Sequence, residues 1–190
     1  MNALPRQSRR DFLRSSFAAV LCSGGLVASA RAAAAQPGTR RLLYVAVPGI
    51  RNYLERGGHG ILVFDIDNNH AFVKRIPARG LSADGKPLNV KGVVASAATG
   101  RIYVSTLQFT TCTDLLTDKI IWEKTYEGGC DRMALSPDGR VMYLPSLEKD
   151  FWNVVDALSG DIIKRIDIQA GAHNTVYGND GKFAYLAGLR

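Results

Sequence analysis

From residue 42 onward, the chain consists of short apolar or alternating apolar and polar runs, separated by turns rich in Gly, Asp, Asn and Pro. An apolar pattern with the period of a helix is nowhere sustained over three turns. Short runs of this kind, bounded by such turn residues, are typical of β-strands. The pattern therefore predicts an all-β fold.

One sequence pattern occurs four times in these runs. A basic residue is followed by one or two apolar residues, a tyrosine and further apolar residues, and a glycine precedes the last three copies. The tyrosines are Tyr44, Tyr103, Tyr143 and Tyr185. The last three lie about 40 residues apart, which is the period of a four-stranded propeller blade. The repeat therefore predicts blades of four antiparallel strands.

The turns divide the chain into units of this size. In the clearest unit, Ser136-Pro137-Asp138-Gly139 forms a tight turn, because proline presets one corner and glycine accepts a positive φ. Four strands are predicted in that unit, at 131–135, 140–145, 151–156 and 161–168. Other strands are predicted at 42–47, 61–66 and 72–76, at 93–96, 101–106, 112–116 and 119–126, and at 174–177 and 182–189. The unit at 42–76 begins with a second strand, so 61–66 is its third strand. An aspartate lies at the same point of each third strand, where we expect it to bind its own backbone as an Asx turn. These aspartates are Asp65, Asp114 and Asp156.

The repeated tyrosine pattern, the turn at 136–139 and the run Val154-Val155-Asp156 followed by Gly160-Asp161-Ile162-Ile163 resemble YVTN-repeat β-propeller proteins. The resemblance covers nearly all of the chain from Leu42 and is strongest between Cys130 and Gly188. It implies a β-propeller at 36–190, with about three and a half blades present and about seven in the full-length protein. Because an open ring exposes a strand edge, we expect the chain to be an N-terminal fragment. Such propellers include binding proteins, lactonase relatives and parts of periplasmic redox enzymes, so the resemblance leaves the activity open.

Residues 1–35 are predicted to be an export signal. Ser8-Arg9-Arg10-Asp11-Phe12-Leu13-Arg14 resembles the twin-arginine motif, and a modest apolar run and small residues follow, with cleavage expected between Ala30 and Gln36. The run is shorter than the roughly 20 apolar residues of a membrane-spanning helix. Cys22 lacks the small preceding residue that lipoprotein processing requires. We therefore expect a periplasmic or secreted mature chain without a membrane anchor.

The leader also accounts for most of the charge. Five arginines against one aspartate carry a net +4 of the formal +7. The remainder includes no run of Lys or Arg that indicates nucleic-acid binding.

After cleavage, Cys112 and Cys130 remain. An oxidising compartment allows a disulfide between them, and two separate thiols are the alternative.

Candidate binding residues come from aligning the first strands of the blades by their turn glycines. This alignment puts Gly92, Asp131 and His173 at one ring position, and Val93, Arg132 and Asn174 at the next. We expect Asp131, Arg132, His173 and Asn174 to converge on the central opening, where they can orient an anion or a sugar. Turn capping or contacts between blades are the alternative roles.

Two long loops, 48–60 and 77–91, are expected on one rim, opposite the tight turns. Long loops on a rigid scaffold often carry function, although they can also be simple insertions. The first loop contributes three further ligand-binding candidates: Arg51, Asn52 and His59. Trp122 and Trp152 are expected to pack within or between blades.

The sequence contains no complete nucleophile, base and orienting group, no P-loop, no haem-attachment motif and no metal-ligand spacing. It therefore indicates no catalytic residue or metal ligand, and it leaves the cofactor unknown. Two hypotheses remain. The first is an exported propeller that binds an unidentified small molecule or protein through its loop-rich rim. The alternative is an enzyme or enzyme module of lactonase-like or periplasmic dehydrogenase type.

Overall fold

The computed structural model describes residues 39–49, 59–147 and 149–190, and the predicted leader lies outside them. The regular structure of these residues consists of strands in four antiparallel sheets. The first sheet is β1 (Leu42–Pro48), β2 (His59–Asp65) and β3 (Ala71–Ile76). The second is β4 (Val90–Ser96), β5 (Arg101–Thr106), β6 (Phe109–Asp114) and β7 (Ile120–Thr125). The third is β8 (Ala134–Leu135), β9 (Val141–Pro145), β10 (Phe151–Asp156) and β11 (Ile162–Asp167), and the last is β12 (Ala172–Tyr177) and β13 (Ala184–Gly188).

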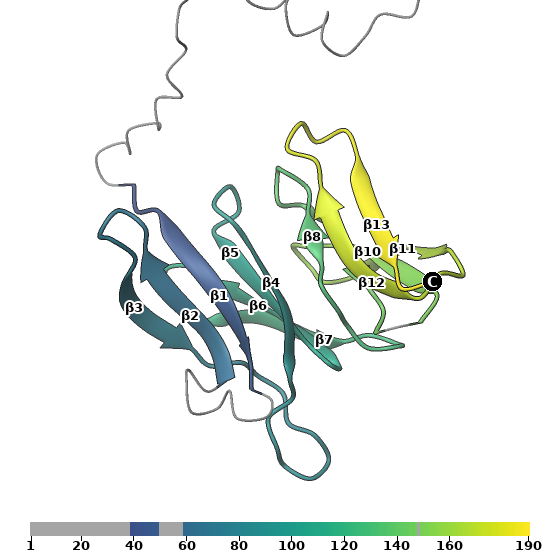
Figure 1. Cartoon of the computed structure of the whole chain (residues 1–190), viewed down its shortest axis with the longest axis horizontal. Helices are drawn as coiled ribbons and strands as arrows, with labels where there is room; N and C mark the ends of the chain where they lie inside the picture. Colours follow the sequence, from purple (N-terminus) through teal and green to yellow (C-terminus); the bar gives the residue numbers. More distant parts are fainter. Residues whose placement is uncertain (1–38, 50–58, 148) are drawn as a thin grey trace, which may run out of the picture. The chain divides into compact units, whose positions relative to one another are not determined.

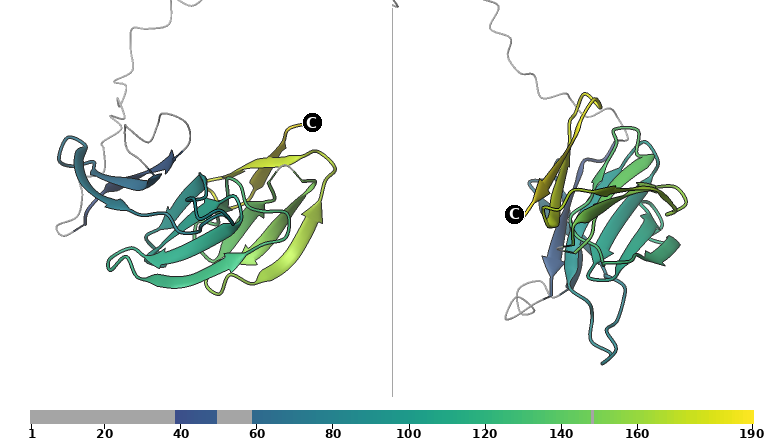
Figure 2. Two further views of the ribbon diagram at one scale, coloured as in Figure 1. Left: turned by 90° about the horizontal axis from the view of Figure 1, so that it is seen from below. Right: turned by 90° about the vertical axis from the view of Figure 1, so that its right-hand side faces the viewer.

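Strands that are consecutive in sequence are hydrogen-bonded neighbours within each sheet, as the blade pattern predicts (Figure 1). The first strands of the last three sheets, β4, β8 and β12, are called the inner strands below. Strand β4 packs against β1 and β8, and β12 packs against β8 and β9. The views in Figure 2 show β12 and β13, in yellow, beside the green strands of the preceding sheet. No helix able to span a membrane is present in the described part of the chain.

Every predicted strand is present, and the bounds differ by up to three residues, at the beginnings of the inner strands among other places. Strand β8 is shorter than the predicted 131–135, because Arg132 forms a parallel bridge with Asn174 of β12 instead of pairing with β9. Strands β4 and β12 begin two or three residues earlier than predicted, at Val90 and Ala172. The inner strands therefore meet one another at this end.

Two hydrophobic clusters occupy the spaces between sheets. One joins β2, β3, β4 and β5, and the other joins the second and third sheets around Tyr103, Met142 and Leu144. Burial raises the pKa of Tyr103 to about 12. The Trp152 indole, fully buried on β10, donates to Thr175 Oγ1 on β12 at 2.9 Å. Trp122 Nε1 likewise donates to the Ala157 carbonyl at 3.3 Å. The prediction of packing between blades is confirmed for both tryptophans.

The third-strand aspartates form the predicted Asx turns. Asp65 Oδ1 accepts from the Asp67 amide at 3.0 Å, and Asp156 Oδ1 accepts from the Leu158 amide at 2.8 Å. Asp114 Oδ1 accepts from the amides of Leu116 and Thr117, and these N–H groups lower the pKa of the Asp114 carboxyl. These carboxylates therefore stabilise local turns.

Both cysteines in the described part of the chain are free, buried thiols. The structure thus contains the two-thiol alternative and not the Cys112–Cys130 disulfide. Cys112 lies on β6, and burial raises the pKa of its thiol. The Cys130 thiol lies instead 3.7 Å from the Gln108 carbonyl, and burial raises its pKa to about 11. The raised pKa values keep both groups in the less reactive thiol form.

Two equivalent turn glycines provide a matched test of the contact between the second and third sheets. Gly139 and Gly100 have φ values of 70° and 65°. A methyl group on Gly139 would lie 2.8 Å from Ser96 Cβ, whereas one on Gly100 would meet nothing within 4 Å. We expect Gly100→Ala to lower the free energy of unfolding by about 1–2 kcal/mol through backbone strain. For Gly139→Ala we expect about 2–4 kcal/mol, because overpacking adds to that strain.

Urea denaturation of both variants measures the difference. Equal losses for the two glycines would show that Ser96 does not contact the turn at 136–139.

Candidate ligand-binding site

The candidate site lies where the inner strands begin. The register of β12 against β13 shifts between Ala172 and Asn174, so that His173 is an extra residue in a bulge. The register of β4 against β5 shifts in the same way between Val90 and Gly92, at Lys91. Bulges redirect side chains and are frequent beside functional sites. Two bulges therefore turn a histidine and a lysine out of the regular strand alternation.

Asp131, His173 and Arg132 form a continuous polar chain. The buried Asp131 carboxylate has Oδ2 3.0 Å from His173 Nδ1. Arg132 Nη1 lies 2.7 Å from His173 Nε2. Arg132 Nη1 also lies 3.3 Å from His173 Nδ1, so the guanidinium is close to both ring nitrogens. His173 therefore lies between the buried carboxylate and the guanidinium.

The backbone of Asp131 is fixed on both sides. Its amide donates to the Pro145 carbonyl at 3.0 Å, and its carbonyl accepts from Ser105 Oγ at 2.8 Å. These bonds fix the backbone of Asp131 to β9 of its own sheet and to β5 of the preceding sheet. The aspartate is therefore a rigid base for the more exposed residues around it.

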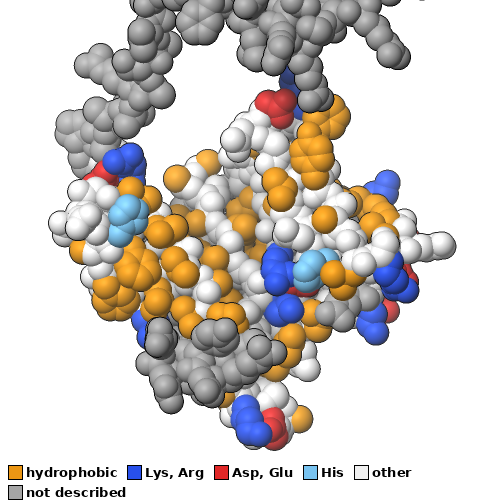
Figure 3. All heavy atoms as spheres, viewed as in Figure 1, with side chains coloured by type: hydrophobic (Ala, Val, Ile, Leu, Met, Phe, Trp, Pro, Cys, Tyr) orange, Lys and Arg blue, Asp and Glu red, His pale blue; other side chains and the backbone are white. Residues whose placement is uncertain are grey.

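Two cations approach the other carboxylate oxygen without bonding to it. Arg132 Nη1 lies 3.7 Å from Asp131 Oδ1, and Lys91 Nζ lies 3.9 Å from it. Within the described residues, Oδ1 has no hydrogen-bond donor. The side chains of Arg132, His173 and Lys91 are 46%, 31% and 21% exposed. In Figure 3, basic and histidine side chains gather over β4 and β12 with hydrophobic side chains around them. Two cations, Arg132 and Lys91, therefore face one carboxylate.

The structure brings together three of the four residues predicted to converge: Asp131, Arg132 and His173. Asn174 is adjacent through its backbone bridge to Arg132, but its side-chain Oδ1 accepts from the Thr175 amide at 2.9 Å. The Asn174 side chain therefore bonds to the backbone of its own strand. Whether the cluster binds a ligand remains a prediction.

Of the three candidates in the first long loop, His59 is described, and it contacts a carbonyl outside this cluster. His59 begins β2, and its Nε2 lies 2.5 Å from the Leu88 carbonyl, which indicates a structural contact. Arg51 and Asn52 lie outside the described residues.

The predicted ring alignment is wrong by one residue in the second sheet. Strand pairing matches the three tyrosines to three positions on the inner strands: Tyr103 to Val94, Tyr143 to Ala134 and Tyr185 to Val176. Lys91, Asp131 and His173 therefore share one ring position, and Gly92, Arg132 and Asn174 share the next. Gly92 approaches the next inner strand closely, because a Cβ there would lie 3.1 Å from Arg132 Cα.

Lys91 is the site residue that the sequence reasoning missed. Gly100 precedes its tyrosine by three residues, whereas Gly139 and Gly181 precede theirs by four. Counting from the glycines therefore displaced the second unit by one position. Counting from the tyrosines would have found Lys91, because the tyrosine pairs across the sheet and the glycine belongs only to the turn.

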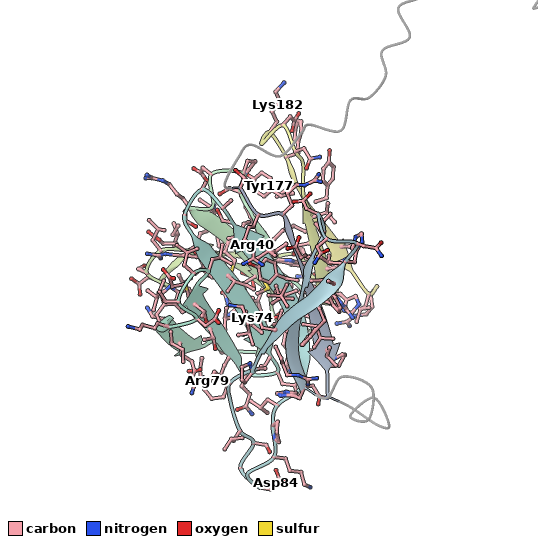
Figure 4. All side chains as sticks on the ribbon, turned by 90° about the vertical axis from the view of Figure 1, so that its left-hand side faces the viewer. Arg40, Lys74, Arg79, Asp84, Tyr177 and Lys182 are labelled. Atoms are coloured by element: carbon pink, nitrogen blue, oxygen red, sulfur yellow. The ribbon has the colours of Figure 1, made fainter. Side chains whose placement is uncertain are left out.

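The second long loop marks one rim of the sheets. Residues 77–89 extend between β3 and β4, and a bridge joins Leu81 to Pro87. Figure 4 shows Asp84 at the tip of this loop, at the opposite end of the sheets from Lys182 in the tight turn between β12 and β13. The predicted separation of this long loop from the tight turns is confirmed. The same loop leads directly into β4, which carries Lys91.

The sequence matches no family model, and no curated protein matches it. Two solved structures are similar to the structure described here. Hydrazine synthase of Kuenenia stuttgartiensis shares 24% identity with a TM-score of 0.50, over 58% of this chain and 31% of that one. Dihydro-heme d1 dehydrogenase NirN, in complex with DHE, shares 18% identity with a TM-score of 0.56, over 76% of this chain and 30% of that one. Both neighbours are β-propeller proteins.

The fold of this chain is a β-propeller. Its four-stranded antiparallel sheets are blades, and neighbouring blades contact one another through their inner strands. The chain spans about a third of the length of the two similar structures. At these identities the likeness concerns the fold, and functions must be argued from the site itself.

Proposed function

We propose that this chain is an exported propeller of the YVTN-repeat type, which binds a small anionic ligand or an acidic group of a partner at its central opening. The site comprises Lys91, Asp131, Arg132 and His173. The observation that carries the proposal is the half-exposed Arg132 guanidinium held by His173 beside a buried carboxylate. Twin-arginine export to the periplasm or the exterior is part of the proposal and rests on the leader sequence.

The arrangement suits anion binding because two cations lie together at a partly exposed position. Arg132 uses Nη1 on His173, which leaves its other N–H groups to form the paired hydrogen bonds that carboxylates accept. Lys91 adds a second positive charge 3.9 Å from the same aspartate oxygen.

The same geometry favours binding over hydrolysis. In a catalytic triad, the histidine nitrogen that faces away from the aspartate accepts the proton of a nucleophile. Here that nitrogen, His173 Nε2, faces Arg132. The Asp131–His173 pair therefore positions a cation.

The second candidate is a redox enzyme module, favoured by the neighbouring structure of a dehydrogenase in complex with DHE. The visible absorption spectrum of the protein, purified from a host that exports it, separates the two proposals. A bound chromophore would favour the redox module. A colourless protein with anion binding that depends on Arg132 would favour the binding propeller.

We expect Arg132→Ala to weaken binding of a simple carboxylate, with propionate as the probe, by about 1.5–3 kcal/mol, the contribution of a charge-assisted hydrogen bond. Isothermal titration calorimetry measures the loss. Arg140→Ala is the matched control, because it removes the same charge from an exposed position at the start of β9. Equal losses for both variants would indicate a general effect of charge and would contradict the proposed site.

A further inference from the structure

The hydrogen-bonding groups of Asp131 are all occupied except one. Its amide, its carbonyl and Oδ2 have partners in Pro145, Ser105 and His173. Oδ1 is buried and has no donor within the described residues. A buried carboxyl oxygen without a donor is unfavourable, and such groups often mark a place where a ligand or water completes the bonding.

The neighbouring cations do not fill this position. Arg132 Nη1 and Lys91 Nζ remain 3.7 Å and 3.9 Å from Oδ1, beyond hydrogen-bonding distance. Arg132 bonds to His173 instead, at 2.7 Å. The site thus offers several unused donors and one unused acceptor, which lie next to each other.

We propose that the ligand is a 2-hydroxycarboxylate, whose carboxylate binds Arg132 and Lys91 while its hydroxyl donates to Asp131 Oδ1. This inference rests on the proposed anion-binding function. A hydroxyl on the carbon next to the carboxylate places a donor beside the anion, as the neighbouring cations and free acceptor require. An ammonium group in that place would face the positive charges of Arg132 and Lys91, so the neutral hydroxyl is favoured over an amino acid.

Access to Oδ1 requires a side-chain movement. Arg132 is half-exposed, and a carboxylate that draws its guanidinium outward uncovers the oxygen beneath. Changes of rotamer at binding surfaces are common even where the backbone stays fixed. The backbone bonds of Asp131 hold the acceptor in place during this movement.

The inner strands also provide space for the rest of the ligand. A hollow of about 550 Å³ lies along these strands, and its lining includes Met133, Val94, Ala134 and Val176. The four residues of the cluster do not line it, so it can take only a part of the ligand that extends beyond the cluster.

Calorimetric titration of the full protein with L-lactate, D-lactate and propionate tests the inference. We expect at least one lactate enantiomer to bind about tenfold more tightly than propionate, since a hydrogen bond to a charged group contributes this much. Asp131→Asn should remove the preference for the hydroxyl, because the amide that replaces Oδ1 donates and does not accept. The wild-type comparison stands by itself if that variant fails to fold.

The outcomes separate this inference from the proposal on which it depends. Equal affinities for lactate and propionate, both weakened by Arg132→Ala, would overturn the hydroxyl contact and leave the anion site intact. Absence of binding by all three probes, or binding insensitive to Arg132→Ala, would overturn both.

Discussion

Trp152→Ala is expected to lower the free energy of unfolding by about 3–5 kcal/mol, the usual cost of truncating a large buried aromatic side chain. Trp152 is fully buried on β10, and its indole donates to Thr175 Oγ1 on β12. The change removes packing between the third and fourth sheets and leaves a buried hydroxyl without this donor. Chemical denaturation followed by circular dichroism measures the loss without relying on tryptophan fluorescence.

Two controls separate packing from hydrogen bonding. Trp152→Phe keeps most of the packing and loses the indole N–H, so we expect a smaller loss of about 1–3 kcal/mol. Leu116→Ala changes a side chain that is 90% exposed, and we expect an effect within about 0.5 kcal/mol. If Trp152→Ala cost no more than Leu116→Ala, the two sheets could not be packed through Trp152 as described.

Replacing Arg9 and Arg10 together by lysine is expected to block export, because the twin-arginine machinery recognises the guanidinium pair and lysine supplies only its charge. Fractionation of cells and immunoblotting of the precursor and mature chain measure the effect. Arg31→Lys is the matched control, since it lies in the leader but outside the motif. Undiminished export of the double variant would show that another route carries the protein.

The arrangement of strands could be predicted because its signals are local. Alternation of apolar residues marks each strand, and a proline–glycine turn such as 136–139 fixes the direction of the next one. The Asx turns of Asp65, Asp114 and Asp156 were equally predictable, because each carboxylate binds backbone groups two or three residues away. Three of the four residues of the candidate site, Asp131, Arg132 and His173, followed from counting back from the turn glycines.

The remaining part of the site depends on contacts that local patterns do not encode. The sequence shows two cysteines in consecutive units, but only their positions in the folded chain leave them as separate buried thiols. From its loop sequence, His59 was predicted as a candidate ligand-binding residue. In the structure, its Nε2 contacts the Leu88 carbonyl instead. Each outcome rests on a partner distant in the chain, which periodicity does not identify.

By itself, the sequence determined an all-β chain of repeated four-stranded units, since strand period and turn chemistry act over a few residues. Only the tertiary structure decided which of the aligned side chains contact one another. Lys91 and His173 lie in bulges that arise from the pairing of whole strands. In the structure, Lys91 Nζ lies 3.9 Å from Asp131 Oδ1, while the Asn174 side chain bonds to the Thr175 amide. These contacts join residues that are distant in the chain, and for this reason local patterns in the sequence did not determine them.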